Sequence, residues 1–237
     1  MEDKIESKPL VEEKKVVVPG EVLATGIEFL PGKGAYKENG EVRSKILGLV
    51  KFKNHLVSVI PLAGVYIPVP NDRIIGEVKD VQITSWFVDI NSPYMGFLSL
   101  SEGVEEFVDL SKKDITEYFD VGDVIYAKIQ KVTKKKDVQL TMKDHMCRKL
   151  HDGNIIRINP AKVPRVIGKS GSMIEMIKNK TGSHIIVGQN GLVWLNGGKE
   201  SLATKAILTI ENESHKEGLT DRIAEMLDKE LKGDNNE

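Results

Sequence analysis

Four consecutive residues, Gly168-Lys169-Ser170-Gly171, have the types and spacing of a loop that holds phosphates. The two glycines have no Cβ, so the backbone of such a loop can approach a phosphate closely. The second glycine precedes a helix predicted over residues 172–180, and the first N–H groups of a helix are unpaired and attract anions. We therefore expect this loop to bind the sugar-phosphate backbone of a single-stranded nucleic acid.

The flanking segments predict the elements that position this loop. Apolar residues recur at helical spacing before and after it, and two short strands, 184–187 and 192–195, flank Asn190-Gly191, a strong hairpin signal. Residues 199–212 are predicted to form a closing helix. The order strand, helix, GxxG, helix, hairpin, helix resembles the eukaryotic-type KH domain, which clamps about four nucleotides. The alternative is an ordinary glycine-rich turn before a helix.

The KH resemblance implies a set of RNA-binding residues in the loop and its flank. Basic residues dominate this region, which would favour a phosphate chain. The expected contacts are Arg165, Ile167, Gly168, Lys169, Ser170 and Gly171. The wider basic group is Arg157, Lys162, Arg165, Lys169, Lys178 and Lys180.

A second unit, over residues 70–143, is predicted to be all β. Five strands with a long third connection are typical of an OB-fold; the expected strands are 73–82, 86–91, 96–100, 124–132 and 137–141. The segments GEVKDVQITSWFVDI, GFLSLSE and VGDVIYAKIQKVTKKKDVQLTMK resemble the S-one motif, an RNA-binding OB-fold of a small-subunit ribosomal protein. The alternative is a barrel that serves only as a scaffold.

The S-one resemblance places the RNA face at five positions, of which Phe87 alone is aromatic. The other four are Thr84, Ser99, Thr133 and Asp137. Trp86 should point to the opposite face, because side chains alternate along a strand. We expect weak, electrostatic phosphate contacts in place of base stacking. The lysines expected to make them are Lys128, Lys131, Lys134, Lys135 and Lys136.

The amino-terminal part is predicted to be a small all-β domain. Its expected strands are 16–18, 21–25, 41–50, 55–61 and 66–68, separated by Gly and Pro turns. Its basic residues have no aromatic residues between them. It therefore lacks the aromatic side chains on which single-stranded nucleic-acid-binding proteins stack bases. We expect a protein-docking module.

Composition narrows the function classes. The net charge of −1 over 237 residues makes any nucleic-acid contact local. The one cysteine, Cys147, excludes an intrachain disulfide and fits a cytoplasmic protein. The charged amino terminus does not resemble a signal peptide, and no apolar run approaches the ~20 residues of a membrane helix.

Catalytic and cofactor chemistry is not expected. Gly168-Lys169-Ser170 resembles the end of a P-loop, but that pattern needs glycine where the chain has Val163. His145, Cys147 and His151 lack a fourth metal ligand at suitable spacing. We therefore expect no metal, no cofactor and no enzyme activity.

Together, the three domains resemble the RNA-binding cap subunit of the archaeal exosome, the ribosomal-RNA-processing-protein-four family. The landmarks are VVVPGEVLATG, PGKGAYKENG, LVSVIPLAGVYIPVPND, WFVDINSPY, KVPRVIGKSGSMIEMIK, VGQNGLVWLNG and IENESHKEGLTDRI. The resemblance implies a multidomain chain: an all-β ring-docking domain (1–68), an S-one-type OB-fold (69–145) and an α+β KH domain with a C-terminal helix (146–237).

The same resemblance implies a non-catalytic subunit. It would form a trimeric cap, with itself or with a related cap subunit, on a hexameric phosphorolytic ring. The cap would recruit single-stranded RNA and thread it into that 3'-5' exoribonuclease for degradation and processing.

Two rival function classes stay open at this stage. One is a free-standing or ribosome-associated RNA-binding protein, which would need no partner for its amino-terminal domain. The other is a degradative enzyme. Bacterial phosphorolytic nucleases carry KH and S-one domains in the opposite order and after two catalytic domains, which argues against this class.

Overall fold

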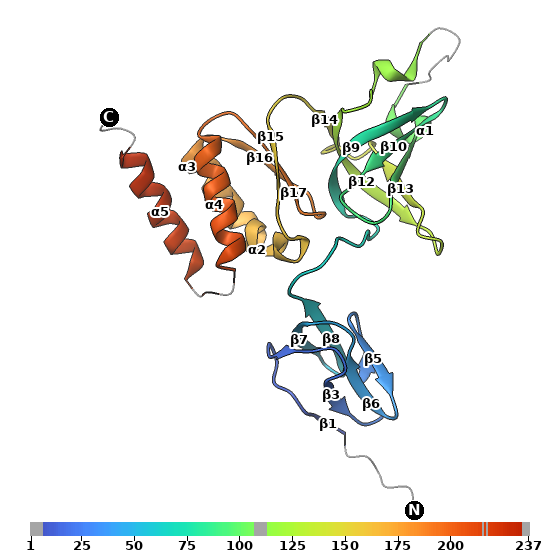
Figure 1. The fold of residues 1–237 in the computed structure, drawn as a ribbon, viewed down its shortest axis with the longest axis vertical. Coiled ribbons are helices and arrows are strands. Elements are labelled where there is room, and N and C mark those ends of the chain that lie inside the picture. Colours follow the sequence, from blue (N-terminus) through green and yellow to red (C-terminus); the bar gives the residue numbers. More distant parts are fainter. Residues whose placement is uncertain (1–6, 107–112, 215, 217, 234–237) are drawn as a thin grey trace, which may run out of the picture. The chain divides into compact units, whose positions relative to one another are not determined.

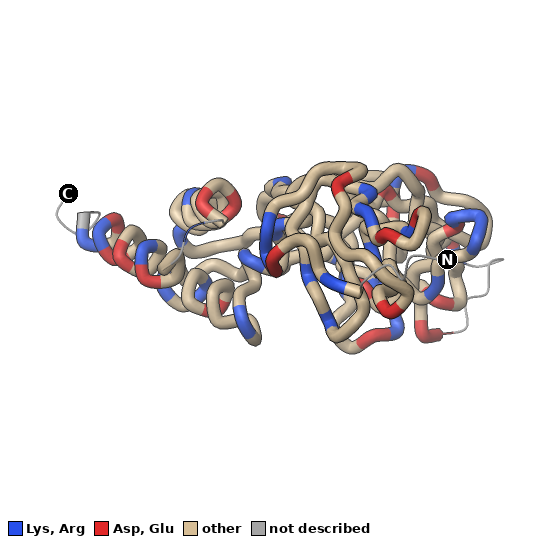
Figure 2. Tube along the Cα trace, turned by 90° about the horizontal axis from the view of Figure 1, so that it is seen from below, with Lys and Arg blue, Asp and Glu red and all other residues tan. Residues whose placement is uncertain are grey.

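The computed structural model describes residues 7–106, 113–214, 216 and 218–233, in two compact units, Met1–Gly64 and Val65–Glu237 (Figure 1). Acidic and basic residues are interspersed along the chain, as Figure 2 shows. None of the helices in the described ranges is long and apolar enough to cross a membrane.

The first unit consists of two small sheets around one core. One sheet has the order β1-β3-β6-β5, from β1 (Lys8–Pro9), β3 (Val22–Thr25), β6 (Glu41–Ser44) and β5 (Ala35–Glu38). The other has the order β2-β7-β8-β4, from β2 (Val16–Val17), β7 (Gly48–Lys53), β8 (Leu56–Pro61) and β4 (Leu30–Pro31). The core consists of alternate strand residues, among them Val17, Leu23, Val42, Val50, Val57 and Val59. The predicted all-β class is confirmed.

Two predicted strands of this region are wrong. The single strand 41–50 is two strands, because buried Ser44 turns the chain between them and donates its hydroxyl to the Ile46 carbonyl (2.6 Å). Residues 66–68 belong to no strand. Tyr66 instead enters the core of the next domain and donates its hydroxyl to the Asp72 carboxylate (2.7 Å). Burial raises the pKa of Tyr66 well above its usual range, so this hydroxyl stays a donor.

The second unit begins with a closed barrel. Its strands are β9 (Arg73–Gln82), β10 (Ser85–Asp89), β11 (Gly96–Ser99), β12 (Val124–Val132) and β13 (Val138–Thr141), with β14 (Arg148–Leu150) added at the edge. The sheet order is β13-β11-β10-β9-β12-β14, and β13 also pairs with β12, which closes the barrel. The predicted OB-type fold is confirmed.

The long connection between β11 and β12 is anchored at the barrel core. It contains α1 (Leu100–Gly103) and the 3-10 turn η1 (Ile115–Glu117), whereas residues 107–112 of this predicted long connection lie outside the described residues. Trp86 is fully buried, as strand alternation predicted, and its indole N–H donates to the Phe119 carbonyl (2.8 Å). The connection thus returns to the barrel at a fixed point.

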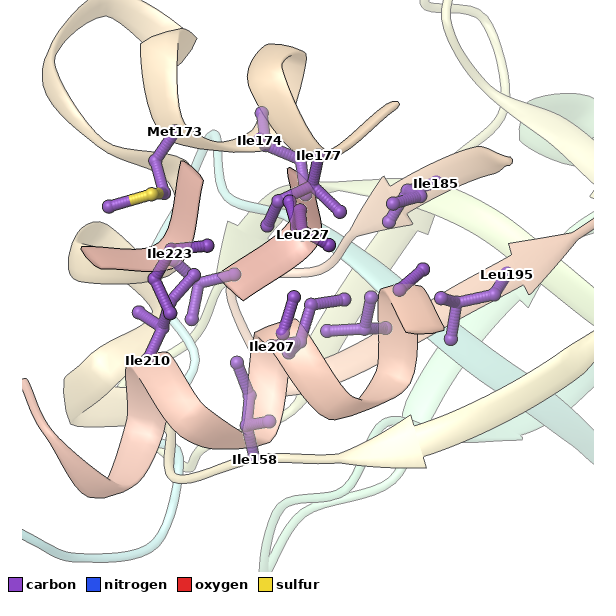
Figure 3. Close-up of a cluster of buried hydrophobic side chains, with 14 of the residues drawn as sticks. Ile158, Met173, Ile174, Ile177, Ile185, Leu195, Ile207, Ile210, Ile223 and Leu227 are labelled. Carbon is purple, nitrogen blue, oxygen red and sulfur yellow. The ribbon is translucent and has the colours of Figure 1, made fainter. Parts of the chain in front are cut away.

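A three-stranded sheet covered by helices completes the second unit. Its strands, in the order β15-β17-β16, are β15 (Asn154–Arg157), β17 (Leu192–Asn196) and β16 (His184–Val187). Its helical segments are η2 (Pro160–Lys162), α2 (Val163–Ile167), η3 (Lys169–Gly171), α3 (Ser172–Thr181), α4 (Glu200–Asn212) and α5 (Leu219–Gly233). Figure 3 shows Ile223 and Leu227 of α5 among core side chains of α3 and α4, such as Met173 and Ile207. The predicted α+β KH-type domain is confirmed.

The β16–β17 hairpin docks on the barrel through Asn190, which is fully buried. The side-chain amide donates to the carbonyls of Ile75 (2.6 Å) and Ile90 (2.8 Å) and accepts from the Ile75 N–H (3.3 Å). An apolar cluster, Ile75, Tyr126, Leu150, Leu192 and Trp194, continues this contact. The predicted hairpin therefore exists, but its Asn side chain binds a neighbouring domain.

Candidate nucleic-acid interface

The GKSG loop has a backbone that requires both glycines, each for a different reason. Gly168 (φ 77°, ψ 178°) occupies a region that is essentially restricted to glycine. A Cβ there would lie 2.8 Å from the backbone N of Met173, so Gly168→Asp would disturb the domain itself. Gly171 is left-handed (φ 86°), and a Cβ there would have no neighbour closer than 3.8 Å. A ligand can therefore approach the backbone closely at Gly171.

The start of α3 is free to receive an anion. Its N-cap is Gly171, which has no side chain to accept from the first-turn N–H groups. Lys169 and Ser170 are exposed, and Ser170 is itself left-handed (φ 53°). The sequence-predicted Lys169, Ser170 and Gly171 thus lie together at a helix N-terminus, the arrangement that binds phosphates through N–H groups.

The flanking residues of this loop have different surroundings. Arg165 is exposed and donates to the Lys216 carbonyl (3.0 Å). Ile167 is half-buried against the domain core. Lys180 donates to the Ala224 carbonyl (3.1 Å) and pairs with Asp228 of α5. Three other members of the predicted basic group make no ion pair within the described ranges: Lys162, Lys169 and Lys178. These leave their charge available to a polyanion.

Lys128, a predicted phosphate contact, lies in an ion-pair network on the barrel. Its ammonium is 3.4 Å from the Asp144 carboxylate, which also accepts from Arg73 at 3.1 and 3.2 Å. The hydrogen bonds from Arg73 lower the pKa of Asp144 to about 2. The positive charge of Lys128 is therefore partly neutralised by the ionised Asp144 carboxylate.

The other predicted lysines have solvent around them. Lys134, Lys135 and Lys136 are exposed on the β12–β13 turn. Thr133 and Asp137 close that turn by bonding to each other, hydroxyl to carboxylate, at 2.9 Å. Both residues were predicted to lie on the RNA face. In the structure their side chains bond to each other and stabilise the turn that carries the three lysines.

Phe87 has an aromatic partner that the sequence reasoning missed. Phe97 is its direct cross-strand neighbour, with ring centroids 5.7 Å apart and ring planes at 66°. Both rings are half-buried on the outer surface, because the alternate residues of β10 and β11 fill the barrel. The antiparallel register of two predicted strands, 86–91 and 96–100, could have indicated this pairing.

The groups considered as metal ligands are not assembled. Among the described residues, no three His, Cys, Asp or Glu side chains are grouped so that they could hold a metal ion. His145 faces Asp144, and the Cys147 thiol donates to the Thr141 carbonyl (3.6 Å). Burial raises the pKa of that thiol.

Three family profiles match consecutive parts of the chain. Residues 14–63 match the N-terminal domain of the exosome RNA-binding protein RRP4. Residues 66–152 match the S1 domain of the exosome complex component RRP40, and residues 153–201 match the KH domain.

Full-length relatives give the same result. The chain is 45% identical over 225 residues to the exosome complex component Rrp4 of Thermococcus kodakarensis, covering 93% of this chain and 87% of that protein. The Rrp4 of Pyrococcus furiosus is 46% identical over 222 residues, covering 92% and 84%. A crystal structure described as an exosome complex RNA-binding protein superposes with a TM-score of 0.65 and 36% identity, covering 71% of this chain and 98% of that one.

Proposed function

The chain belongs to the Rrp4 family of exosome complex components, and from that membership we propose that it is a non-catalytic RNA-binding cap subunit. It recruits single-stranded RNA and threads it into a hexameric phosphorolytic 3'-5' exoribonuclease ring. Three cap subunits, all of this chain or mixed with a related one, form the cap. Its single cysteine suits the cytoplasm.

The loop at the start of α3 is the observation that carries the proposal. Its left-handed residues leave Lys169 and Ser170 exposed beside a helix N-terminus without a side-chain cap. Such a surface binds phosphates without reading bases, which suits a subunit that must accept many RNA sequences.

A charge reversal confined to the loop tests its role. Lys169→Glu combined with Ser170→Asp adds negative charge where phosphates approach, at two exposed positions that already carry a side chain. RNA affinity should fall at least about tenfold, because binding releases fewer counterions when a phosphate contact is lost. Lys229→Glu on the exposed surface of α5 is the charge control and should change affinity little. Equal losses of RNA affinity in both variants would indicate a general charge effect and would refute RNA binding by the loop.

The absence of catalysis is tested directly. Purified protein is incubated with end-labelled RNA and phosphate, and then with magnesium or manganese. We expect no shortening. Degradation that co-purifies with this polypeptide, and that resists removal of other proteins, would contradict the non-catalytic assignment.

Docking on the ring is proposed for the first unit. Val16, Leu49 and Ile60 form one cross-strand row on its surface, and Val16 and Ile60 are 51% and 46% exposed. An apolar row of this kind suits a protein contact. Val16→Asp with Ile60→Asp should abolish co-elution with the ring while RNA affinity is retained. Ile27→Asp, at a residue that is 88% exposed, is the control.

Cooperation between cap subunits gives a second test. Several RNA-binding modules on one ring raise the effective concentration of RNA, so the assembled protein should bind more tightly than the free chain. Titration of RNA against both forms at several salt concentrations measures the difference. Equal affinity of the two forms would contradict the cap arrangement.

A further inference from the structure

Strand β15 is one edge of the KH sheet, and no described strand pairs with its outer side. The sheet order is β15-β17-β16. The Ile158 N–H donates to the Gly191 carbonyl (2.8 Å), and Arg157, one residue earlier, lies opposite Leu192. Because bonded pairs alternate along an antiparallel ladder, the N–H and C=O groups of Ile155 and Arg157 point away from β17. They form a row of main-chain donors and acceptors to which another strand can bind.

Two pockets adjoin this edge. Ile155 lies opposite Trp194, so its side chain is on the face turned toward the barrel, and it is 41% exposed. One pocket, of about 230 Å³, lies between β15 and the barrel strands β9 and β10. The other, of about 280 Å³, is lined by Lys149 and His151 on the side of β14. Ile155 lines both pockets, which therefore follow one another along β15.

The pocket beside β9 has more carboxylates than cations in its wall. Glu77 and Asp89 both line it and are direct cross-strand partners, a position in which like charges repel each other. Glu77 pairs with Lys79 (2.6 Å), whereas the Asp89 carboxylate accepts from the Asn91 N–H (2.9 Å) and has no ion pair within the described residues. Arg157 is the cation that lines this pocket, and it pairs with neither carboxylate. A cation bound between the two carboxylates would relieve their repulsion.

These features favour a peptide over a nucleic acid. The outward main-chain groups of β15 have the spacing of a β-ladder, which matches the main chain of an extended peptide. A peptide that adds a strand to a sheet edge also places alternate side chains in pockets beside that edge. A phosphate chain in the same groove would be repelled by the Glu77 and Asp89 carboxylates.

We propose that β15 is the docking site for an extended peptide segment of a partner protein. The segment adds a strand to the KH sheet, packs an apolar side chain on Ile155 and places a lysine or arginine side chain between Glu77 and Asp89. This inference goes beyond the proposed RNA-binding function and does not depend on it. It gives the KH domain a second surface that recruits protein.

Selection from a displayed library of random peptides tests this site on the full-length protein. Ile155→Pro is the counter-target, because proline removes an outward N–H and is accepted on the outer side of an edge strand. Peptides enriched on the unaltered protein should carry lysine or arginine among alternating apolar residues. They should bind the Ile155→Pro protein about tenfold more weakly, since a main-chain hydrogen bond is lost.

A second variant tests the charged pocket without altering the backbone. Asp89→Asn should weaken binding of the enriched peptides about 3- to 10-fold, because a charge-assisted hydrogen bond is lost. Glu225→Gln, at an exposed residue of α5, removes the same charge elsewhere and should leave peptide affinity unchanged. Circular dichroism verifies that Ile155→Pro is folded, and Asp89→Asn takes its place as the counter-target if it is not.

Amide hydrogen exchange identifies the mode of binding. A peptide paired with the strand edge should slow exchange at Ile155 and Arg157, whose N–H groups point outward in the free protein. Enrichment of no peptide on the unaltered protein over both variants would overturn the proposal, as would enriched peptides that leave exchange at these two residues unaltered.

Other occupants of the groove give distinct results, each of which would also overturn it. Displacement of the peptides by a single-stranded RNA oligonucleotide, with tighter RNA binding by Asp89→Asn, would assign the groove to RNA. A concentration-dependent dimer that Ile155→Pro abolishes would assign the edge to a second copy of this chain.

Discussion

Replacing Asn190 by alanine should loosen the contact between the barrel and the KH domain. The side chain is fully buried and makes three hydrogen bonds to the backbone of Ile75 in β9 and of Ile90, directly after β10. Truncation removes all three and leaves the Ile75 N–H without its side-chain acceptor. The apolar cluster around Trp194 would remain.

The magnitude follows from counting these bonds. A buried hydrogen bond contributes about 0.5–1.5 kcal/mol net, so three give about 1.5–4.5 kcal/mol. Carbonyls tolerate the loss of one partner better than an N–H does, which favours the middle of that range. We expect the free energy of unfolding of the second unit to fall by about 2–4 kcal/mol.

Urea unfolding followed by tryptophan fluorescence measures this change, and amide hydrogen exchange at Ile75 localises it. Asn179→Ala, at an exposed residue of α3, is the matched control and should change the free energy by less than about 0.7 kcal/mol. An Asn190→Ala effect no larger than that of the control, with unaltered exchange at Ile75, would refute the view that Asn190 joins the two domains.

Three further predictions concern other parts of the chain. Asp144 has a folded-state pKa of about 2, below the ~3.9 of an unfolded chain. The stability it contributes is therefore complete above about pH 4 and is lost as the pH falls through 2; Asp144→Asn should be less stable than the unaltered protein at pH 6, and the difference should vanish near pH 2 in urea titrations. Tyr66→Phe should cost about 1–3 kcal/mol in the same assay, because the Asp72 carboxylate loses a donor. Gly171→Ala should cost about 1–2 kcal/mol for its left-handed backbone, and Gly168→Ala should lower the melting temperature more, because its methyl would also meet the backbone of α3; the reverse order would show that the loop relaxes freely.

Much of the second unit could be predicted from the sequence, because its strong patterns are local. The bounds predicted for β9 and β12, residues 73–82 and 124–132, agree with the structure. Long alternating strands bounded by turns need no knowledge of their neighbours. The helix after the GKSG loop was likewise expected within one residue of its end at Thr181.

The surroundings of single side chains could not be predicted in the same way. Asn190 carries an ordinary hairpin signal, but its partners lie on strands about a hundred residues away. The alternation around Tyr66 resembles a strand because Tyr66 and Pro68 are buried, whereas Val65, Ile67 and Val69 are exposed. Lys128 was expected to contact phosphate, and only the fold brings Asp144 beside it. Contacts of this kind depend on which surfaces meet.

The positions of the two tryptophans allow the unfolding of one unit to be followed by intrinsic fluorescence. Trp86 is enclosed in the barrel core and Trp194 lies at the contact with the KH domain, where its indole N–H donates to the Asp152 carbonyl (2.7 Å). Neither lies in Met1–Gly64. Tryptophan emission therefore follows Val65–Glu237 alone, whereas circular dichroism follows the whole chain. Unfolding curves that separate between the two signals would reveal that the units melt independently. Trp194→Phe would leave an emission that reports only on the barrel interior.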